Sequence, residues 1–442
     1  MSRFKVKRLS RLHLRPFHHY ALVWHRYVGL GLAALLVVVG LTGSLLAFQH
    51  ELDVALNPEL WRAIPEPGAR LLEPFELSER VQRQLPSGLS HGSVQFELVP
   101  GEARPFWVES APGRWEQHFA NPYTGELLGS RRWGDIAEGK RNLVPFLYRL
   151  HYALALDGFG QWLLGIAALL WSLDCFVGAY LTFPVRSPGA GSRSPVGWLR
   201  RWFPAWLVRT SKPFAMVFTG HRAAGLWLWG MLFVFAWSAV GLNLPHVYRP
   251  VTRAVFGLEP NVHDQLPQLA APFPKPGLSL QVAHARAREL MAQAAEQRAF
   301  RIQREVSLQY LADHGAFMYR VQSTLDISAT RPRTEVYFDG RSGKPLGFNA
   351  ALGPTAGNTL TSWLYALHFS EVGGLPYRLF VTCVGAVVAA LSASGAWIWW
   401  VKRRKRTRAR SLVREGTAAA PVLVNARARP HIDSGRLDQE EA

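Results

Sequence analysis

His25-Arg26-Tyr27-Val28-Gly29-Leu30 recurs 196 residues later as His221-Arg222-Ala223-Ala224-Gly225-Leu226, and Leu147-Tyr148-Arg149-Leu150-His151 recurs as Leu364-Tyr365-Ala366-Leu367-His368. Each copy opens or immediately precedes a long apolar run. His50 and His246 are also separated by 196 residues, whereas His151 and His368 are separated by 217. The duplication predicts a chain built from two halves with the same order of elements, the second half having the longer central loop.

Four apolar runs are long enough to cross a bilayer, which takes about 20 residues in a helix. They lie near Ala21–Phe48, Gln161–Phe183, Phe214–Leu242 and Leu379–Val401 in a chain of 442 residues that is 49% hydrophobic. The first run is longer than the apolar part of a cleaved signal peptide, and no small-residue cleavage site follows it, so we expect a retained helix. The two cysteines, Cys175 and Cys383, fall inside apolar runs and offer no disulfide framework.

The net charge is +19, and basic and acidic residues are concentrated in different segments of the chain. Residues 1–26 and 184–222 carry arginine and lysine but no acid, and Lys402–Arg406 follow the last run, whereas segment 51–140 is rich in Glu and Asp. The positive-inside rule places both termini and loop 184–213 in the cytoplasm and the two long loops outside. Because the basic residues flank apolar runs, they indicate membrane topology and not nucleic-acid binding.

The expected fold is a mainly α membrane protein: a four-helix transmembrane bundle made of two parallel repeats, with two small α+β outer domains. In chain order we expect a basic cytoplasmic N-terminus (1–20), transmembrane helix 1 (21–50), outer domain 1 (51–146), a juxtamembrane segment and helix 2 (147–183), a basic and aromatic cytoplasmic loop in contact with lipid (184–213), helix 3 (214–244), outer domain 2 (245–360), a juxtamembrane segment and helix 4 (361–401), and a disordered basic cytoplasmic tail (402–442).

The two outer domains also resemble each other. Asn121–Gly129 corresponds to Asp339–Gly347, and each reads as a turn in which glycine supplies a positive φ. We expect helices over Leu77–Leu85 and Leu280–Arg298. Alternating patterns predict strands over Val94–Val99, Pro105–Glu109, Ala316–Ser323 and Arg333–Phe338.

Polar side chains in membrane helices usually have a function. His25 and His221 both lie at the cytoplasmic start of their helices, and a twofold axis between parallel repeats would bring them face to face. Imidazole is a standard axial ligand of haem iron. Arg26 and Arg222 follow directly and are in place to meet haem propionates.

His151 and His368 form a second candidate ligand pair on the outer side. His50 and His246, at the outer ends of helices one and three, are alternative ligands for the same outer site. His25 and His50 are 25 residues apart, about 38 Å along a helix, which exceeds the ~30 Å hydrocarbon core. Two stacked haem sites are therefore expected. The alternative is that these histidines are structural and match only because the halves share ancestry.

Asp174 is a carboxylate inside the second span. It is a candidate for relaying protons, binding a quinol hydroxyl or orienting a ligand. The alternative is a structural Asp that is either protonated or bonded to Ser or Trp. The chain contains no phosphate-binding loop, dinucleotide fingerprint, HExxH or CxxC. It therefore shows no nucleotide, NAD or zinc site of its own.

Together these motifs resemble the PepSY-associated transmembrane family. The resemblance rests on the two HRxxGL helix starts, Gly40-Leu41-Thr42-Gly43, the LYxLH segments and the stretch Leu173–Pro184. The outer units resemble PepSY domains, with TGxxLG-type turns at Thr124–Gly129 and, less exactly, at Ser342–Gly347. The likeness covers about residues 20–405.

The resemblance implies a bacterial inner-membrane protein of iron uptake, similar to ferric-siderophore reductases with two b-type haems. Electrons would cross the membrane to a periplasmic ferric siderophore, and reduction would release the iron. Some relatives carry a fused flavin module that is not seen here, so we expect a quinol or a separate protein as the electron donor. Two other functions stay open: a PepSY-type binding or regulatory membrane protein, and a siderophore permease without redox activity.

Overall fold

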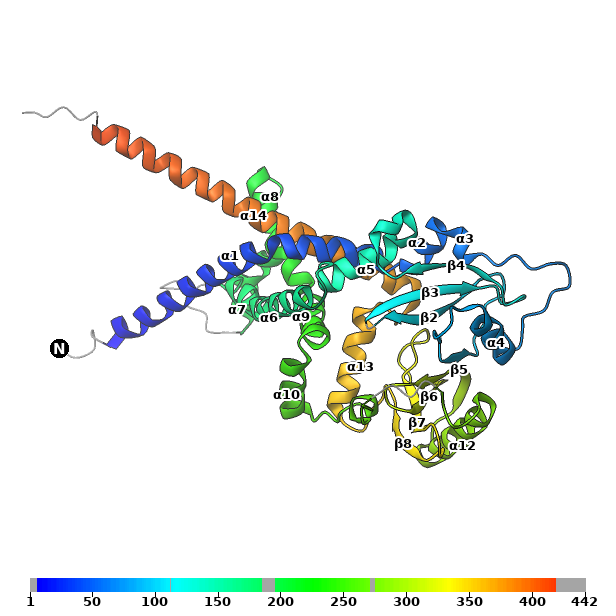
Figure 1. Cartoon of the computed structure of the whole chain (residues 1–442). Helices are drawn as coiled ribbons and strands as arrows, with labels where there is room; N and C mark the ends of the chain where they lie inside the picture. Colours follow the sequence, from blue (N-terminus) through cyan, green and yellow to red (C-terminus); the bar gives the residue numbers. More distant parts are fainter. Residues whose placement is uncertain (1–5, 112, 185–194, 271–274, 419–442) are drawn as a thin grey trace, which may run out of the picture. The chain divides into compact units, whose positions relative to one another are not determined.

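The computed structural model describes residues 6–111, 113–184, 195–270 and 275–418 (Figure 1). The chain divides into two compact units, Met1–Ala396 and Trp397–Ala442. The first unit contains all the strands and all the helices except the last part of α14 (Gly374–Ala418). The contacts below lie within that unit.

Three helices are long and apolar enough to cross a membrane, or four spans if a bent pair is counted as one. The three are α1 (Val6–Leu46), α6 (Asp157–Leu181) and α14, and the bent pair is α8 (Pro213–Trp227) with α9 (Trp229–Asn243). The four apolar runs predicted from sequence coincide with these spans, except that the first two runs end two residues beyond their helices, which end at Leu46 and Leu181. The helices α1 and α14 extend further, into the basic segments before residue 21 and after residue 401.

The third span is not the continuous helix that the sequence predicts. It bends by 68° between α8 and α9. Leu228 at the bend has φ −101° and ψ 6°, outside the helical region. The adjacent Trp229 donates its indole N–H to the backbone carbonyl of Cys175 in α6, at 2.9 Å. The bend is therefore anchored by the neighbouring helix, a tertiary effect that hydropathy cannot reveal.

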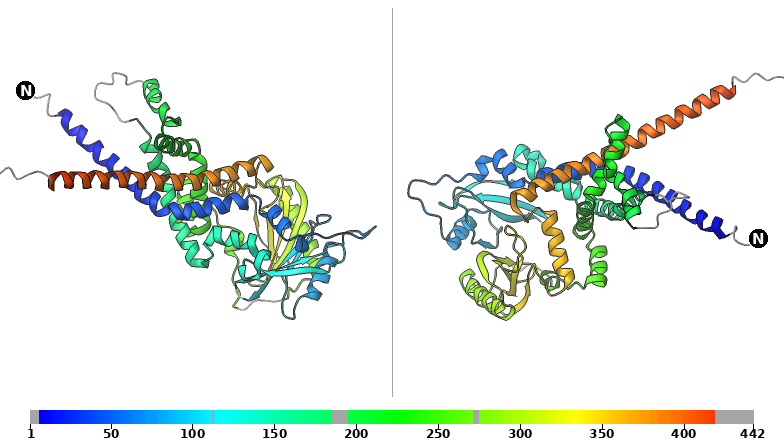
Figure 2. Two further views of the ribbon diagram at one scale, coloured as in Figure 1. Left: turned by 90° about the horizontal axis from the view of Figure 1, so that it is seen from above. Right: turned by 180° about the vertical axis from the view of Figure 1, so that it is seen from behind.

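Small residues let α1 and α14 approach closely, as is common between membrane helices. A Cβ added to Gly40 would lie 2.7 Å from the carbonyl oxygen of Gly385. One turn later, the hydroxyl of Ser44 donates to the carbonyl of Thr382 at 2.8 Å. Figure 2 shows the two helices crossing. In addition, α6 packs against both α1 and α9.

Shorter elements connect the spans to the sheets. They are α2 (Gln49–Leu56), α3 (Pro58–Trp61), the 3₁₀ helix η1 (Ile136–Asn142), α5 (Leu143–Ala153), α7 (Pro195–Trp202), the 3₁₀ helix η2 (Phe203–Trp206), α10 (Pro245–Phe256), α11 (Val262–Gln265) and α13 (Ala356–His368). The helices α5 and α13 end at or near the duplicated His151 and His368.

Two antiparallel sheets lie in the long loops (Figure 1). The first contains β2 (Arg104–Ala111), β3 (Arg114–Ala120) and β4 (Leu127–Arg132), and α4 (Pro74–Gln84) packs Leu77 and Val81 against it. The second has the order β1 (Ser93–Gln95), β5 (Ile302–Leu311), β6 (Ala316–Ser323), β7 (Thr334–Asp339), β8 (Pro345–Asn349). The helix α12 (Leu280–Arg298) covers it through Ala283, Ala287 and Met291.

The two long loops are joined through the second sheet. Strand β1 comes from the first loop but pairs with β5 of the second, Val94 lying opposite Leu308. An ion pair of 3.5 Å between Arg304 and Glu97 reinforces this junction. The sequence indicates a strand near Val94 but not its partner, because alternation shows which face is buried and not which strand lies alongside.

The duplicated turns are confirmed. Gly125 has φ 77° and Gly343 has φ 69°. In the first turn the N–H of Asn121 donates to the carbonyl of Glu126 at 2.8 Å, and in the second the N–H of Asp339 donates to that of Lys344 at 2.9 Å. The same backbone conformation and hydrogen bonding therefore occur in both loops.

A buried ion pair connects the end of the first span to the first sheet. Asp53 of α2 accepts from both terminal nitrogens of Arg131 in β4, at 2.9 and 2.6 Å. Asn57 and Trp61 donate to the same carboxylate. Because a buried charge without its partner is costly, this network orients the first sheet relative to α2.

The sequence predicts a tail without ordered structure from residue 402, but α14 continues to Ala418. Arg, Lys, Leu and Ala are good helix formers, and they dominate this stretch. The rest of the predicted tail, residues 419–442, lies outside the described residues.

Candidate functional site

The structure brings the first duplicated histidines together. The ring centres of His25 in α1 and His221 in α8 are 6.3 Å apart, with planes at 63°. Nδ1 of His25 is hydrogen-bonded to the carboxylate of Asp174 in α6, at 2.9 Å. Nδ1 of His221 is hydrogen-bonded to the hydroxyl of Ser394 in α14, also at 2.9 Å. We call this the inner pair.

The second duplicated histidines form an equivalent arrangement. The ring centres of His151 in α5 and His368 in α13 are again 6.3 Å apart, with planes at 66°. Nδ1 of His151 is hydrogen-bonded to the hydroxyl of Thr42 in α1 at 3.0 Å, and Nδ1 of His368 to that of Ser238 in α9 at 2.6 Å. We call this the outer pair.

The hydroxyl partners determine which ring nitrogen carries the proton. Three of the partners donate their own hydroxyl hydrogen to a backbone carbonyl of the same helix. The bonds are Thr42 to Val38 at 2.8 Å, Ser238 to Val234 at 2.6 Å and Ser394 to Leu391 at 2.9 Å. Each hydroxyl oxygen must therefore accept from the imidazole, so Nδ1 bears the hydrogen. The lone pair is then on Nε2, which leaves that nitrogen able to bind a metal.

The separation of 6.3 Å between ring centres in both pairs suits two imidazoles that share one metal ion. A first-row metal lies about 2.0–2.1 Å from an imidazole nitrogen, and the ring centre lies roughly 1.1 Å beyond that nitrogen, so opposed ligands have centres about 6.3 Å apart. Within the described ranges no group of three or more His, Cys, Asp or Glu side chains is arranged to hold a metal. Each pair by itself therefore offers two imidazole nitrogens.

Glycines allow helices to approach these rings. A Cβ on Gly43 would lie 2.9 Å from Cε1 of His151, one on Gly178 would lie 3.4 Å from Cε1 of His25, and one on Gly395 would lie 3.3 Å from Cε1 of His221. Gly178 and Gly395 have the same separation in sequence as the two histidines of the outer pair. The close approach helps to fix the plane of each ring.

Burial keeps the outer pair uncharged. It lowers the pKa of His151 to about 4. Burial, together with the neighbouring His151, lowers the pKa of His368 to about 3. Both imidazoles are therefore neutral at physiological pH, as metal coordination requires.

Asp174 is the one carboxylate in contact with a histidine of the inner or outer pair among the described residues. Its side chain is buried, Oδ2 is bonded to His25, and Oδ1 has no hydrogen-bond partner in the described part of the chain. This contact fixes the orientation of the His25 imidazole, and the proton and quinol roles predicted for Asp174 stay predictions.

Other candidate residues have different surroundings. The guanidinium of Arg222 donates to the carbonyls of Ala205 and Pro204, which ties α8 to η2. His50 lies beside Glu102 and Trp61, and the ring of His246 lies 5.4 Å from that of Trp162.

Arg26 has no hydrogen bond or ion pair among the described residues. Within those ranges neither His50 nor His246 contacts a second histidine. Of Arg26 and Arg222, Arg26 is therefore the one without a partner in the described part of the chain, and the candidate histidines that meet are those of the inner and outer pairs.

Sequence reasoning missed Thr42, Ser238 and Ser394. Thr42 and Ser238 have the same separation in sequence as His25 and His221. The duplication could therefore have identified them as a matched pair of polar residues. Ser394 has no such counterpart, because its role toward the inner pair is taken by Asp174 in the other half.

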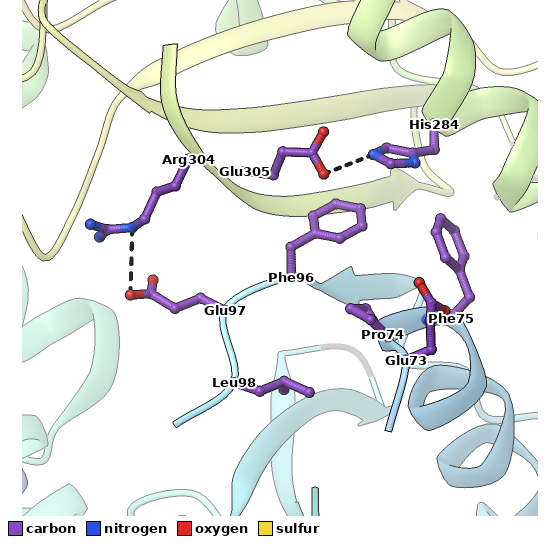
Figure 3. Close-up of a pocket in the computed structure, with 9 residues that line it drawn as sticks. All are labelled: Glu73, Pro74, Phe75, Phe96, Glu97, Leu98, His284, Arg304 and Glu305. Atoms are coloured by element: carbon purple, nitrogen blue, oxygen red, sulfur yellow. Dashed lines mark hydrogen bonds and ion pairs between the residues drawn. The ribbon is translucent and has the colours of Figure 1, made fainter. Parts of the chain in front are cut away.

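A small cavity of about 480 Å³ lies where the two long loops meet (Figure 3). His284 is bonded to Glu305 at 3.1 Å, and its ring stacks on Phe96 at 4.7 Å. Arg304 pairs with Glu97 on the other side of the cavity. These polar groups are bonded to one another, so we assign the cavity no ligand.

Comparison with known proteins agrees with the motifs. The family described as the PepSY-associated TM region matches residues 22–402, a range that includes all four paired histidines and most of each apolar span. No curated protein matches the chain. The match covers most of the sequence, so this chain is a membrane protein and belongs to the PepSY-associated TM region family.

Proposed function

We propose that this protein is a b-type di-haem oxidoreductase of the bacterial inner membrane, which passes electrons outward to a periplasmic ferric siderophore and so releases iron for uptake. The observation that carries the proposal is the repeated geometry of the two histidine pairs. Both have centres 6.3 Å apart, and all four Nδ1 atoms are engaged by other side chains.

We infer that the spans form a four-helix bundle of two parallel repeats, α1 with α6 and the bent α8–α9 with α14. Two further couples support the repeat, because the members of each contact corresponding histidines: Thr42 and Ser238 are 196 residues apart, and Gly178 and Gly395 are 217 apart. Basic segments beside the inner pair support cytoplasmic termini, and the acidic first loop supports periplasmic PepSY-like domains.

The histidines would hold one haem b at each level. When bound, haem supplies a one-electron carrier whose potential depends on its axial ligands and their hydrogen bonds. His25 and His221 would serve at the inner level, and His151 and His368 at the outer level. Arg26 is free to pair with a propionate. Thr42, Ser238, Ser394 and Asp174 hold the imidazoles in the tautomer that leaves Nε2 available.

The electrons would enter at the inner level from a quinol or a separate donor protein. One electron converts Fe³⁺ to Fe²⁺ in the chelate, so one quinol, oxidised to the quinone with release of two protons, serves two ferric ions. Hard oxygen ligands bind ferrous iron less tightly than ferric iron, so reduction releases the metal.

Visible spectroscopy of the purified full-length protein from a haem-replete host tests the proposal. We expect a reduced-minus-oxidised spectrum of low-spin b-type haem at two haems per chain. His25→Ala and His368→Ala should each remove one haem, while His246→Ala should keep both. A protein that folds but contains no haem would refute the proposal, and an unchanged haem content in both of the first two variants would refute the ligand assignment.

The bent third span favours a second candidate, a siderophore permease without redox activity. Broken helices often mark binding sites in transporters, because the interrupted backbone can line a cavity. Uptake of a gallium(III) siderophore into proteoliposomes without any reductant would support this candidate, since gallium(III) is not reduced. Absence of uptake, together with two haems per chain, would exclude it.

A further inference from the structure

A large cavity lies beside the outer pair and is not explained by the histidine geometry. Its volume is about 1090 Å³, slightly above the roughly 300–1,000 Å³ of small-molecule sites. Residues of β1 and β2, of the stretch from α10 to α11, of β5–β8 and of α13 line it. Both long loops therefore contribute to its walls.

The cavity is strongly basic. Seven arginines and four carboxylates line it, which leaves a side-chain charge of +3. Two of the arginines are neutralised by lining carboxylates, Arg249 by Asp264 at 2.8 Å and Arg320 by Glu335 at 2.6 Å. Arg331 is paired with Glu371 outside the lining. The excess charge is therefore on the remaining arginines.

Those remaining arginines are Arg104, Arg253, Arg298 and Arg333, and none makes an ion pair within the described ranges. The guanidinium of Arg298 lies over the ring of Phe348, and that of Arg333 lies over Tyr365, at 4.7 and 5.4 Å from the ring centres. Stacking orients a guanidinium but leaves its N–H groups free for an anion.

Arg104 shows the need for an anion most directly. Its Nη2 donates to Gln95 at 2.6 Å, but its buried Nε has no partner among the described residues. Burial lowers the pKa of this guanidinium, while the nearby carboxylates of Glu97 and Glu102 partly oppose that shift. A desolvated cation with an unused donor is costly, and a carboxylate that accepts from it would offset that cost.

Tyr365 connects the cavity to the outer pair. It lines the cavity and lies three residues before His368 on α13, about 4.5 Å along the helix axis. Its hydroxyl contacts α9, where a Cβ added to Gly241 would lie 2.9 Å from it. Gly241 is one turn beyond Ser238, the partner of His368. The wall of the cavity that Tyr365 forms therefore lies about one helical turn from His368.

We infer that this cavity binds a polyanionic, carboxylate-bearing metal chelate, and that the protein discriminates against cationic chelates of similar size. The inference rests on the proposed function in that the chelated Fe³⁺ would accept one electron from the outer level and become Fe²⁺. No bond to the protein forms or breaks. The arginines provide charge and hydrogen bonds, while Trp107 and Tyr365 provide apolar surface.

Binding can be separated from electron transfer with gallium(III), which replaces Fe³⁺ but is not reduced under these conditions. Isothermal titration of full-length protein in nanodiscs with gallium(III) citrate should show saturable binding. The cationic gallium(III) complex of desferrioxamine B should bind at least tenfold more weakly. Because a hydrogen bond to a charged group contributes about 1.5–3 kcal/mol, Arg298→Gln and Arg333→Gln should each weaken citrate-complex binding roughly tenfold or more.

Arg301→Gln is the matched control, because Arg301 is exposed and does not line the cavity. It should leave binding unchanged. Equal affinity for the two complexes, or affinity that Arg298→Gln and Arg333→Gln do not alter, would overturn the inference. So would the absence of binding by a protein that contains both haems, which would leave the proposed function standing. Binding by a protein without haem would refute the proposed function and support the cavity assignment.

Discussion

Asp174→Asn changes the charge next to one histidine while keeping a hydrogen-bond acceptor of the same shape. In the wild type, Nδ1–H of His25 donates to the carboxylate at 2.9 Å. A carboxylate acceptor makes the imidazole more electron-rich, and this stabilises the ferric state of the metal that it would hold. Removing the negative charge should therefore raise the reduction potential of the haem proposed for the inner level.

The size of the shift follows from the kind of hydrogen bond. Hydrogen bonds to charged groups contribute about 1.5–3 kcal/mol and neutral ones about 0.5–1.5 kcal/mol, so the change removes roughly 1–1.5 kcal/mol of preference for the ferric state. For a one-electron couple a tenfold change in equilibrium constant is about 59 mV. We expect one of the two transitions to move by roughly +40 to +65 mV and the other to stay in place.

A spectroelectrochemical titration of the purified protein at fixed pH measures both transitions. Asp157→Asn is the control: it makes the same substitution in the same helix, but Asp157 is exposed and pairs with Arg149. It should leave both potentials unchanged. Two unmoved transitions in Asp174→Asn, or an equal shift of both, would refute the reasoning that links this carboxylate to the inner pair.

Three further substitutions test other parts of the structure. Thr42→Val removes the acceptor for Nδ1–H of its histidine and should weaken haem retention at the outer level by about 10–100-fold, measured as haem per chain after exhaustive washing; unchanged retention would argue against the tautomer assignment. Asp53→Asn leaves a buried arginine without its counter-charge and should lower the free energy of unfolding by about 3–5 kcal/mol, measured by denaturation in detergent; a loss below about 1 kcal/mol would contradict the buried network. Gly40→Ala forces the first and last spans apart and should destabilise by about 1–3 kcal/mol, whereas Gly29→Ala, which meets nothing within 4 Å, should not; equal stability of the two variants would exclude close crossing at Gly40.

Duplication made much of the site accessible from sequence. A histidine at one membrane interface has many uses, but two copied motifs in parallel halves must meet across a common axis if the halves pack together. The structure agrees with this expectation, since His25 lies near His221 and His151 lies near His368. Strands and turns that were duplicated, such as those around Gly125 and Gly343, were equally predictable because each copy carried its own local signal.

Features that depend on contacts between the halves were not predictable. The bend at Leu228 is anchored by the hydrogen bond from the indole of Trp229 to α6. A hydropathy profile contains no information about such a contact. Strand β1 pairs with β5, which belongs to the other half of the chain, and so short a strand gives too little pattern to specify a partner. The basic cavity combines arginines from both loops, so no single stretch of sequence resembles an anion site.

The departure from symmetry between the halves is itself informative. The outer pair has a hydroxyl on each side, Thr42 and Ser238, whereas the inner pair has the hydroxyl of Ser394 on one side and the carboxylate of Asp174 on the other. With haem at both levels, as proposed, a carboxylate acceptor would stabilise the ferric state at the inner level more than the two hydroxyl acceptors would at the outer level. The inner potential should then be the lower of the two, and electrons should run downhill from the cytoplasmic side toward the basic cavity. A protein whose transition of lower potential disappears in His368→Ala, and not in His25→Ala, would have the opposite order.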